Sequence, residues 1–206
     1  MASWIRRPFS APGLTQIPPG PHLRAVQGRF GGTVMLCIDM SGSMHGAPIL
    51  AAVRGARQFV ADAVTARYHV GVMLWNDRVE AVSEPTADGK AALALLAPVN
   101  SAWGENDLFV ALTHCHQILD RFTGDRVVAV FGDGDLTPKH QVLIKVAQMK
   151  AENIRFVTRG LGPSAAREFG EISDEDPSSA AIDNVADLAD SIAGMATSLN
   201  RHGLTR

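Results

Sequence analysis

The sequence predicts a doubly wound, three-layer α/β/α sandwich of the Rossmann-like kind, with a mostly parallel central sheet and one antiparallel edge strand. Four short runs are continuously apolar, as expected of strands covered by helices on both faces. Segments whose apolar residues recur at helical spacing alternate with these runs. One further run follows its predecessor after only Asn76 and Asp77, a gap that suits a hairpin and therefore an antiparallel strand.

Each predicted element has its own pattern and its own boundary. The buried strands are the runs TVMLCID, HVGVMLW, RVVAVFG and IRFVTRGL. Pro48 lies in the first turn of the first helix, where it costs little, and Pro98 ends the second helix. The third helix carries six apolar residues on one face, from Leu108 to Leu119. In order, we expect strands at 33–39, 69–75, 78–83, 126–132 and 154–161, and helices at 49–64, 90–99, 108–122, 139–152 and 184–199.

Composition fits one globular domain. The chain has 206 residues, of which 46% are hydrophobic and 19% charged, so it can bury a core. We place the domain at 30–202, after a Pro- and Gly-rich extension at 1–29. A net charge of −2 gives no reason to expect nucleic acid or a membrane surface as the partner. Because no secretion signal pattern and no membrane-spanning apolar run is found, we expect a cytoplasmic protein.

Several residues invite a functional interpretation but are expected to be structural. Cys37 and Cys115 fall within a strand and a helix pattern, and are interpreted as small buried hydrophobes. His114 and His116 point about 200° apart on a helix and so cannot share a metal. Trp75 is expected to pack in the sheet. The acidic stretch at 168–190, which contains no Lys or Arg, is interpreted as solvated surface.

Oxygen-bearing side chains cluster after two of the buried strands. Asp39, Ser41 and Ser43 follow the first strand on a tight turn, and Asp133 follows the strand at 126–132. In such sheets ligands bind at the carboxyl ends of the strands. Two carboxylates at neighbouring strand ends repel each other and lose hydration, and a bound cation is the usual compensation. Carboxylates, hydroxyls and water suit one Mg²⁺ or Mn²⁺ ion, with a coordination position left open. Asp135, next to this cluster, is expected to be solvated.

These motifs resemble the metal-ion-dependent adhesion site (MIDAS) of von Willebrand factor A (vWA) domains. Asp39-Met40-Ser41-Gly42-Ser43 is similar to the family's DxSxS opening, and Met44 and Gly46 also match its common form. Asp133-Gly134 is similar to the family's later strand-ending Asp-Gly. The stretch 104–108 corresponds to a third loop that supplies a Thr in the family. The resemblance covers about residues 32 to 200 in motif order.

The third loop departs from the family pattern. Asn106 stands where the family has Thr, so a carboxamide oxygen would replace a hydroxyl. Asn106 is the first candidate for the third ligand and Asp107 the second, and Glu105 adds another carboxylate beside them. Gly132 replaces the usual Thr before the second Asp, which changes the support of the ligand behind it.

Two residues beside the site are candidates for contact with a partner. Trp103 directly precedes the third loop, where an aromatic side chain is either an interface anchor or part of the core. His45 follows the DxSxS turn. The resemblance implies that the ion binds an Asp or Glu carboxylate donated by a protein partner.

The function that the resemblance implies is that of a metal-dependent binding domain and not of an enzyme. Small vWA proteins of the stand-alone bacterial kind act as adaptors for AAA+ ATPases or for kinase and phosphatase modules, which supplies an analogy only. Extracellular adhesion is the alternative within the binding class. A different class is a Mg²⁺-dependent phosphatase of the haloacid dehalogenase type with Asp39 as nucleophile. That family needs a second carboxylate where this chain has Ser41.

Overall fold

The structure is a computed structural model that describes residues 31–134, 136–176, 181–182 and 184–200. The N-terminal extension predicted at 1–29 and Asp135 lie outside the described residues.

The described residues form one six-stranded sheet in the order β3-β2-β1-β4-β5-β6. Only β3 runs antiparallel, paired with β2 at one edge, and all other neighbours are parallel. The predicted mostly parallel sheet with one antiparallel edge strand is therefore confirmed. Apolar runs became strands because both of their faces are covered. The strands are β1 (Thr33–Asp39), β2 (His69–Trp75), β3 (Val79–Val82), β4 (Arg126–Gly132), β5 (Ile154–Leu161) and β6 (Ala181–Ile182).

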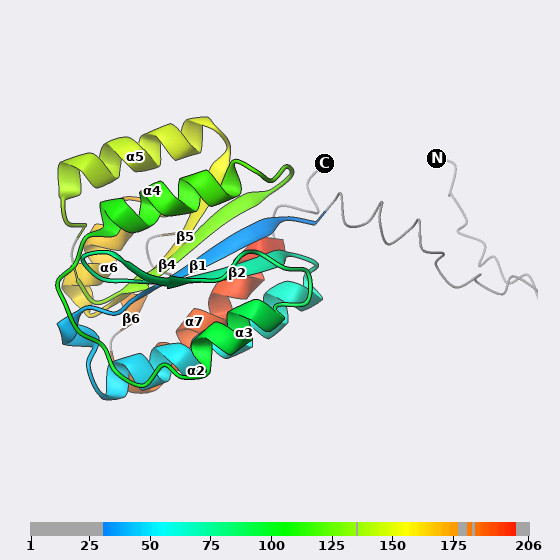
Figure 1. Cartoon of the computed structure of the whole chain (residues 1–206). Coiled ribbons are helices and arrows are strands. Elements are labelled where there is room, and N and C mark those ends of the chain that lie inside the picture. Colours follow the sequence, from blue (N-terminus) through cyan, green and yellow to red (C-terminus); the bar gives the residue numbers. More distant parts are fainter. Residues whose placement is uncertain (1–30, 135, 177–180, 183, 201–206) are drawn as a thin grey trace, which may run out of the picture.

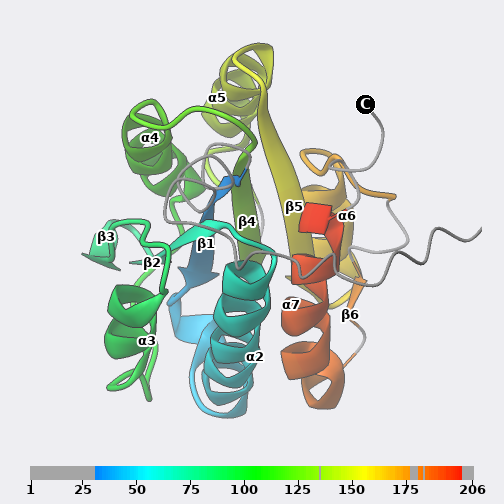
Figure 2. The same ribbon diagram turned by 90° about the vertical axis from the view of Figure 1, so that its right-hand side faces the viewer.

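Helices cover both faces of this sheet and complete three layers (Figures 1 and 2). One face carries α2 (Ala47–Thr65), α3 (Lys90–Leu96) and α7 (Val185–Asn200). The other carries α4 (Leu108–Leu119), α5 (Lys139–Ala151) and α6 (Pro163–Gly170). A single 3₁₀ turn, η1 (Gly42–Met44), lies between β1 and α2. Across the described ranges, no helix is both long enough and apolar enough to cross a membrane.

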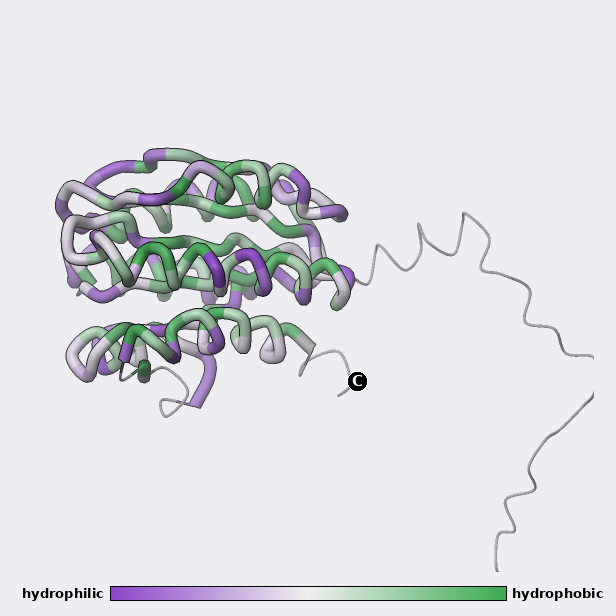
Figure 3. The backbone as a smooth tube through the Cα atoms, turned by 90° about the horizontal axis from the view of Figure 1, so that it is seen from below, coloured by the Kyte–Doolittle hydropathy of each residue, from purple (hydrophilic) through white to green (hydrophobic). Residues whose placement is uncertain are grey.

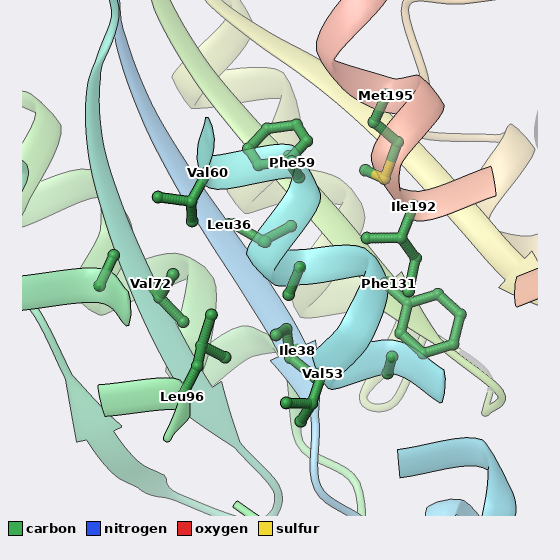
Figure 4. Close-up of a cluster of buried hydrophobic side chains, with 14 of the residues drawn as sticks. Leu36, Ile38, Val53, Phe59, Val60, Val72, Leu96, Phe131, Ile192 and Met195 are labelled. Atoms are coloured by element: carbon green, nitrogen blue, oxygen red, sulfur yellow. The ribbon is translucent and has the colours of Figure 1, made fainter. Parts of the chain in front are cut away.

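The central strand β1 divides its side chains between two hydrophobic cores. Leu36 and Ile38 pack under α2, α3 and α7, as Figure 4 shows, whereas Met35 and Cys37 pack under α4. Every residue of β1 is buried, because helices cover both faces of the sheet at this strand. A fully buried Leu or Ile contributes about 1.5–3 kcal/mol, which anchors β1 firmly. In Figure 3 the same layers are seen from below, and hydrophobic stretches, coloured green, run along both the strands and the helices.

The helices α2 and α7 lie side by side because α2 carries a glycine at their contact (Figure 2). A Cβ atom at Gly55 would lie 2.5 Å from the backbone oxygen of Ala189, so any larger residue would push the helices apart. The last turns of α7 are held by polar contacts, since the Tyr68 hydroxyl donates a hydrogen bond of 3.0 Å to the Leu199 carbonyl.

Two elements were not predicted, and one interpretation was too simple. Helix α6 and the two-residue strand β6 both lie in or beside the acidic stretch that was interpreted as solvated surface. Ile172 and Ile182 of this stretch are buried. Glu175 forms an ion pair with Arg159, and its side chain is only 12% exposed. The acidic stretch is therefore partly core, because a cation from β5 reaches it.

Candidate metal centre

The candidate site lies where β1 and β4 end side by side, at the left of Figure 1. The two strands pair in parallel up to Ile38 and Phe131, so the residues that follow them emerge at the same edge of the sheet. The chain leaves β1 toward β2 and leaves β4 toward β5 on the opposite side. This is the switch point at which open α/β sheets bind ligands. Asp39 and Asp133 are thereby brought together.

The turn after β1 links these two carboxylates through its serines. The backbone N–H of Ser41 donates a hydrogen bond of 2.7 Å to Oδ1 of Asp39. The hydroxyls of Ser41 and Ser43 lie 3.2 Å apart, and the Ser43 hydroxyl donates a 2.8 Å hydrogen bond to Oδ1 of Asp133. Four of the five predicted ligands therefore belong to one hydrogen-bonded group, to which Asp39 is joined by the Ser41 N–H.

The third loop is docked on this turn by its backbone. The N–H of Trp103 donates to the carbonyl of Met40 at 2.6 Å, and the N–H of Gly42 donates to the carbonyl of Gly104 at 3.0 Å. Gly104 has a φ of +90°, and a Cβ atom there would lie 2.8 Å from Nδ2 of Asn76. Glycine is therefore required at position 104 for the loop to approach the site.

Asn76 is a positioning residue that the sequence pattern did not single out. It is fully buried at the end of β2. Its Nδ2 donates to the Trp103 carbonyl at 3.0 Å and to Oε1 of Glu80 at 2.9 Å, and the backbone carbonyl of Asn76 accepts the N–H of Asp107 at 2.8 Å. From the sequence, Asn76 is expected only to be part of a hairpin gap. An amide directly after a buried strand was the available signal.

The three polar residues of the third loop have different places. Asn106 reaches the loop after β4, because a Cβ atom at Gly134 would lie 2.2 Å from its Nδ2. Asp107 caps α4, with Oδ1 accepting a 3.2 Å hydrogen bond from the N–H of Val110. Glu105 is exposed and lines a pocket of about 330 Å³. The described residues that line it are Ser41, Gly42, Ser43, Gly104, Glu105, Asn106 and Gly134.

The electrostatics of the site are dominated by the buried carboxylate of Asp39. Its side chain has no exposed surface, and burial raises its pKa to about 6. Hydrogen bonds from Ser41 oppose this shift, and the charge of Asp133 adds to it. Its Oδ2 is buried and has no hydrogen-bond partner among the described residues. A buried carboxylate oxygen without a donor is costly, and a hard divalent cation bound by carboxylates and hydroxyls would offset that cost.

The two rim candidates lie next to one another at the mouth of the site. Trp103 is 48% exposed, so it is not a packed core residue. His45 is exposed, and its Nδ1 lies 3.3 Å from the carbonyl oxygen of Ala102, which precedes Trp103. Gly132, where the family has Thr, leaves room for the carboxylate of Asp39, because a Cβ atom there would lie 2.9 Å from its Oδ2.

A second group of possible metal ligands, His116, Asp120 and Glu152, lies at the opposite end of the sheet. His116 is buried, with Nε2 located 2.7 Å from Oε2 of Glu152. The Lys145 ammonium lies 2.7 Å from Nδ1 and has only protons to offer, so Nε2 carries the ring proton that Glu152 accepts. Both ring nitrogens are thus engaged in structural hydrogen bonds, in keeping with the polar role predicted for His116.

Comparison with known families gives one match. The family profile described as von Willebrand factor type A domain matches residues 34–135, from β1 to the loop after β4. No curated protein sequence matches the chain significantly.

Several solved structures have a similar fold at low identity. The vWF domain of the type V pili tip protein Mfa5 from Porphyromonas gingivalis has a TM-score of 0.71 at 12% identity, covering 86% of this chain and 97% of that one. The SpRpn10 VWA domain has a TM-score of 0.63 at 14% identity, covering 78% and 93%. The pilus adhesin SpaC from Lactobacillus rhamnosus GG, in its open conformation, has a TM-score of 0.65 at 12% identity over 81% of this chain. The present chain spans only 30% of the SpaC chain.

Proposed function

The chain belongs to the von Willebrand factor type A family, and from this we propose that it is a protein-binding domain whose site captures a partner carboxylate through one divalent cation. Domains of this family often mediate protein–protein interaction. The observation that carries the proposal is the Asp39 carboxylate, fully buried with Oδ2 lacking a donor among the described residues.

The residues that would hold the ion are those brought together at the ends of β1 and β4. Asp39 and Asp133 supply the charge, and the hydroxyls of Ser41 and Ser43 supply neutral oxygens. Asn106 is the proposed third-loop ligand, since Asp107 already uses Oδ1 to cap α4. When bound, Mg²⁺ or Mn²⁺ supplies a positive charge that can bind an external Asp or Glu carboxylate.

Contact area around the ion would come from the rim. Trp103 is exposed beside the pocket, and its backbone is fixed at both ends of the residue, by Met40 and by Asn76. A half-exposed aromatic side chain on a fixed backbone loses little entropy on binding, which favours its use as an interface anchor. His45 extends the same rim.

We propose binding and not catalysis as the activity. A phosphatase nucleophile must reach its substrate, but the Asp39 carboxylate has no exposed surface and its Oδ1 accepts the Ser41 N–H. Ser41 also occupies the position at which that class of enzyme needs a carboxylate. A generic aryl phosphate assay in Mg²⁺ tests this alternative, and turnover lost in Asp39→Asn would favour it.

The setting of this binding function is a further proposal. We propose an intracellular assembly, such as one with an AAA+ ATPase or a kinase or phosphatase module. Adhesion is the second candidate, because two of the similar structures are a pilus adhesin and a pili tip protein. Localising the full-length protein in its own cells separates the two settings.

Thermal unfolding in EDTA, Mg²⁺ and Mn²⁺ tests the metal site. An ion at tenfold its Kd should add about 1.4 kcal/mol, and so raise Tm by a few degrees. The shift should vanish in Asp39→Ala and persist in Asp62→Ala, which removes an acid from α2 away from the site. A wild type whose Tm is the same in all three buffers would count against metal binding by the free protein.

Partner capture is the second arm of this test. Proteins retained by the wild type in Mg²⁺ should be lost in EDTA and with Asp39→Ala. Trp103→Ala should weaken the same capture, whereas Leu93→Ala, an exposed hydrophobic residue on α3, should not. Equal capture in Mg²⁺ and in EDTA would contradict the proposed mechanism.

A further inference from the structure

Glu105 occupies a position that the proposed site does not need for holding the ion. It lines the pocket together with Ser41 and Ser43, and among the described lining residues it is the only one with an ionisable side chain. The hydrogen bond from Gly42 to the carbonyl of Gly104 fixes the residue before Glu105 directly against the serine turn. The side chain of Glu105 therefore starts from a fixed backbone at the wall of the pocket.

No counter-ion in the described part of the chain holds Glu105 elsewhere. Among the described residues Glu105 has neither a salt bridge nor a hydrogen-bonded partner for its carboxylate, and no Lys or Arg lines the pocket. Two neighbouring acids are engaged, since Glu80 pairs with Arg78 and Asp107 caps α4. An unpaired carboxylate at the wall is free to turn toward any positive charge that enters.

A cation bound beneath it would provide that charge. The buried Asp39, whose Oδ2 has no donor among the described residues, marks independently where a positive charge is required. A carboxylate tethered to the same loop has an effective concentration of at least millimolar at the ion. A free carboxylate in solution would have to exceed that concentration to compete.

We propose that Glu105 acts as a competitor in cis, closing the outward coordination position of the ion until a partner carboxylate displaces it. This inference rests on the proposed metal site and concerns the regulation of that site. Simple carboxylates such as acetate should then fail to displace Glu105 from the ion. A partner must gain additional binding energy from the rim, at Trp103, to replace Glu105. Glu105 therefore sets the minimum affinity that a partner needs in order to bind.

Water relaxation of the Mn²⁺-loaded protein measures this directly, with acetate as the probe carboxylate. We compare the wild type with Glu105→Gln and with Glu84→Gln. The control, Glu84→Gln, removes the same charge from an exposed ion pair with Arg121. Glu84 follows the C-terminal end of β3. Glu105→Gln should show one more exchangeable water on the ion than the wild type. Acetate should displace this water in Glu105→Gln and so lower its relaxation, whereas the wild type and the control, in which Glu105 holds that position, should show little change.

The outcomes separate this inference from the function on which it rests. Equal relaxation and equal acetate competition in all three proteins would overturn the role of Glu105 and leave the metal site standing. A folded wild type that takes up no Mn²⁺ would overturn the metal site itself. If folded Glu105→Gln and Glu105→Gly both lose Mn²⁺ binding, Glu105 is a permanent ligand and not a displaceable competitor.

Discussion

The hydroxyl of Ser43 donates a 2.8 Å hydrogen bond to Oδ1 of Asp133, although the two residues are 90 positions apart in the chain. This bond joins the turn after β1 to the loop after β4 across the mouth of the site. It fixes the orientation of the more accessible carboxylate toward the turn that holds the buried one. Ligand geometry in a metal site depends on such contacts.

Removing this bond should affect ion binding more than folding. For Ser43→Ala we expect Mn²⁺ affinity to fall roughly tenfold or more, because a ligand and the orientation of Asp133 are lost together. Because Ser43 is exposed, the free energy of unfolding in EDTA should fall by less than about 1 kcal/mol. Calorimetric titration with Mn²⁺ and denaturant unfolding in EDTA measure the two effects.

Thr65→Ala is the matched control, since its hydroxyl also makes one exposed hydrogen bond, to Ala61 within α2. Its Mn²⁺ affinity should equal that of the wild type. An unchanged affinity in Ser43→Ala would show that the Ser43 hydroxyl does not contribute to the site.

The raised pKa of Asp39 predicts an unusual dependence of stability on pH. Burial raises this pKa to about 6 in the folded protein, above the ordinary value near 4. Between these values the folded state binds a proton that the unfolded state does not. In EDTA the free energy of unfolding should therefore increase as pH falls from 7 to 5, by about 1 kcal/mol relative to Asp39→Asn. Denaturant unfolding at each pH measures it.

The same proton should compete with the ion. Stabilisation by Mg²⁺ should be greatest above pH 6 and should decline below it, because binding then requires loss of the proton from Asp39. Parallel pH profiles for the wild type and Asp39→Asn in EDTA would refute the assignment of the raised pKa to Asp39.

The space at Gly132 predicts a site-specific effect of a single methyl group. In Gly132→Ala the added Cβ would lie 2.9 Å from Oδ2 of Asp39 and 3.1 Å from the ring of Phe169, so the carboxylate must shift. We expect weaker Mn²⁺ binding together with a loss of about 1–3 kcal/mol of stability. Gly170→Ala, where an added Cβ meets nothing within 4 Å, should leave Mn²⁺ affinity unchanged. Wild-type affinity in Gly132→Ala would mean that the Asp39 carboxylate is not tightly confined.

The two cysteines should be unreactive in the folded protein. Cys37 and Cys115 are fully buried, with their sulfur atoms 3.2 Å apart. The hydrogen bond with Cys37, together with burial, raises the pKa of Cys115 well above its ordinary value, so the reactive thiolate is scarce. A thiol-specific disulfide reagent should label neither cysteine before unfolding and both after it. Rapid labelling of the native protein would show that the α4 face opens readily.

The strands and most helices could be predicted because their signals are local. Continuous apolar runs and helical periodicity depend only on neighbouring residues, and the faces they predicted are buried. Helix α6 has only three buried residues, at Ala165, Ala166 and Phe169, which is too few to produce a periodic signal. Strand β6 has two residues and owes its conformation to pairing with β5.

The site could be predicted only as far as motif order determines it. Asp39 ends β1 and Asp133 follows β4, and these two strands pair, so the proximity of the two carboxylates follows from the topology. The ion pair between Arg159 and Glu175 and the role of Asn76 depend on which side chains meet across the folded molecule. Those contacts leave no periodic trace in the sequence. The contrast between a capping Asp107 and a pocket-lining Glu105 likewise depended on the exact path of the third loop.

The placement of Asp39 and Asp133 on either side of the sheet's switch point makes the candidate site a product of both halves of the chain. Neither the segment ending with α3 nor the one beginning with α4 holds the complete set of proposed ligands. A domain cut between α3 and α4 should thus become two fragments that an ion helps to reassemble. In the intact chain, the same linkage means that binding of the proposed ion would strengthen the cooperativity of the whole domain and not the rigidity of one loop.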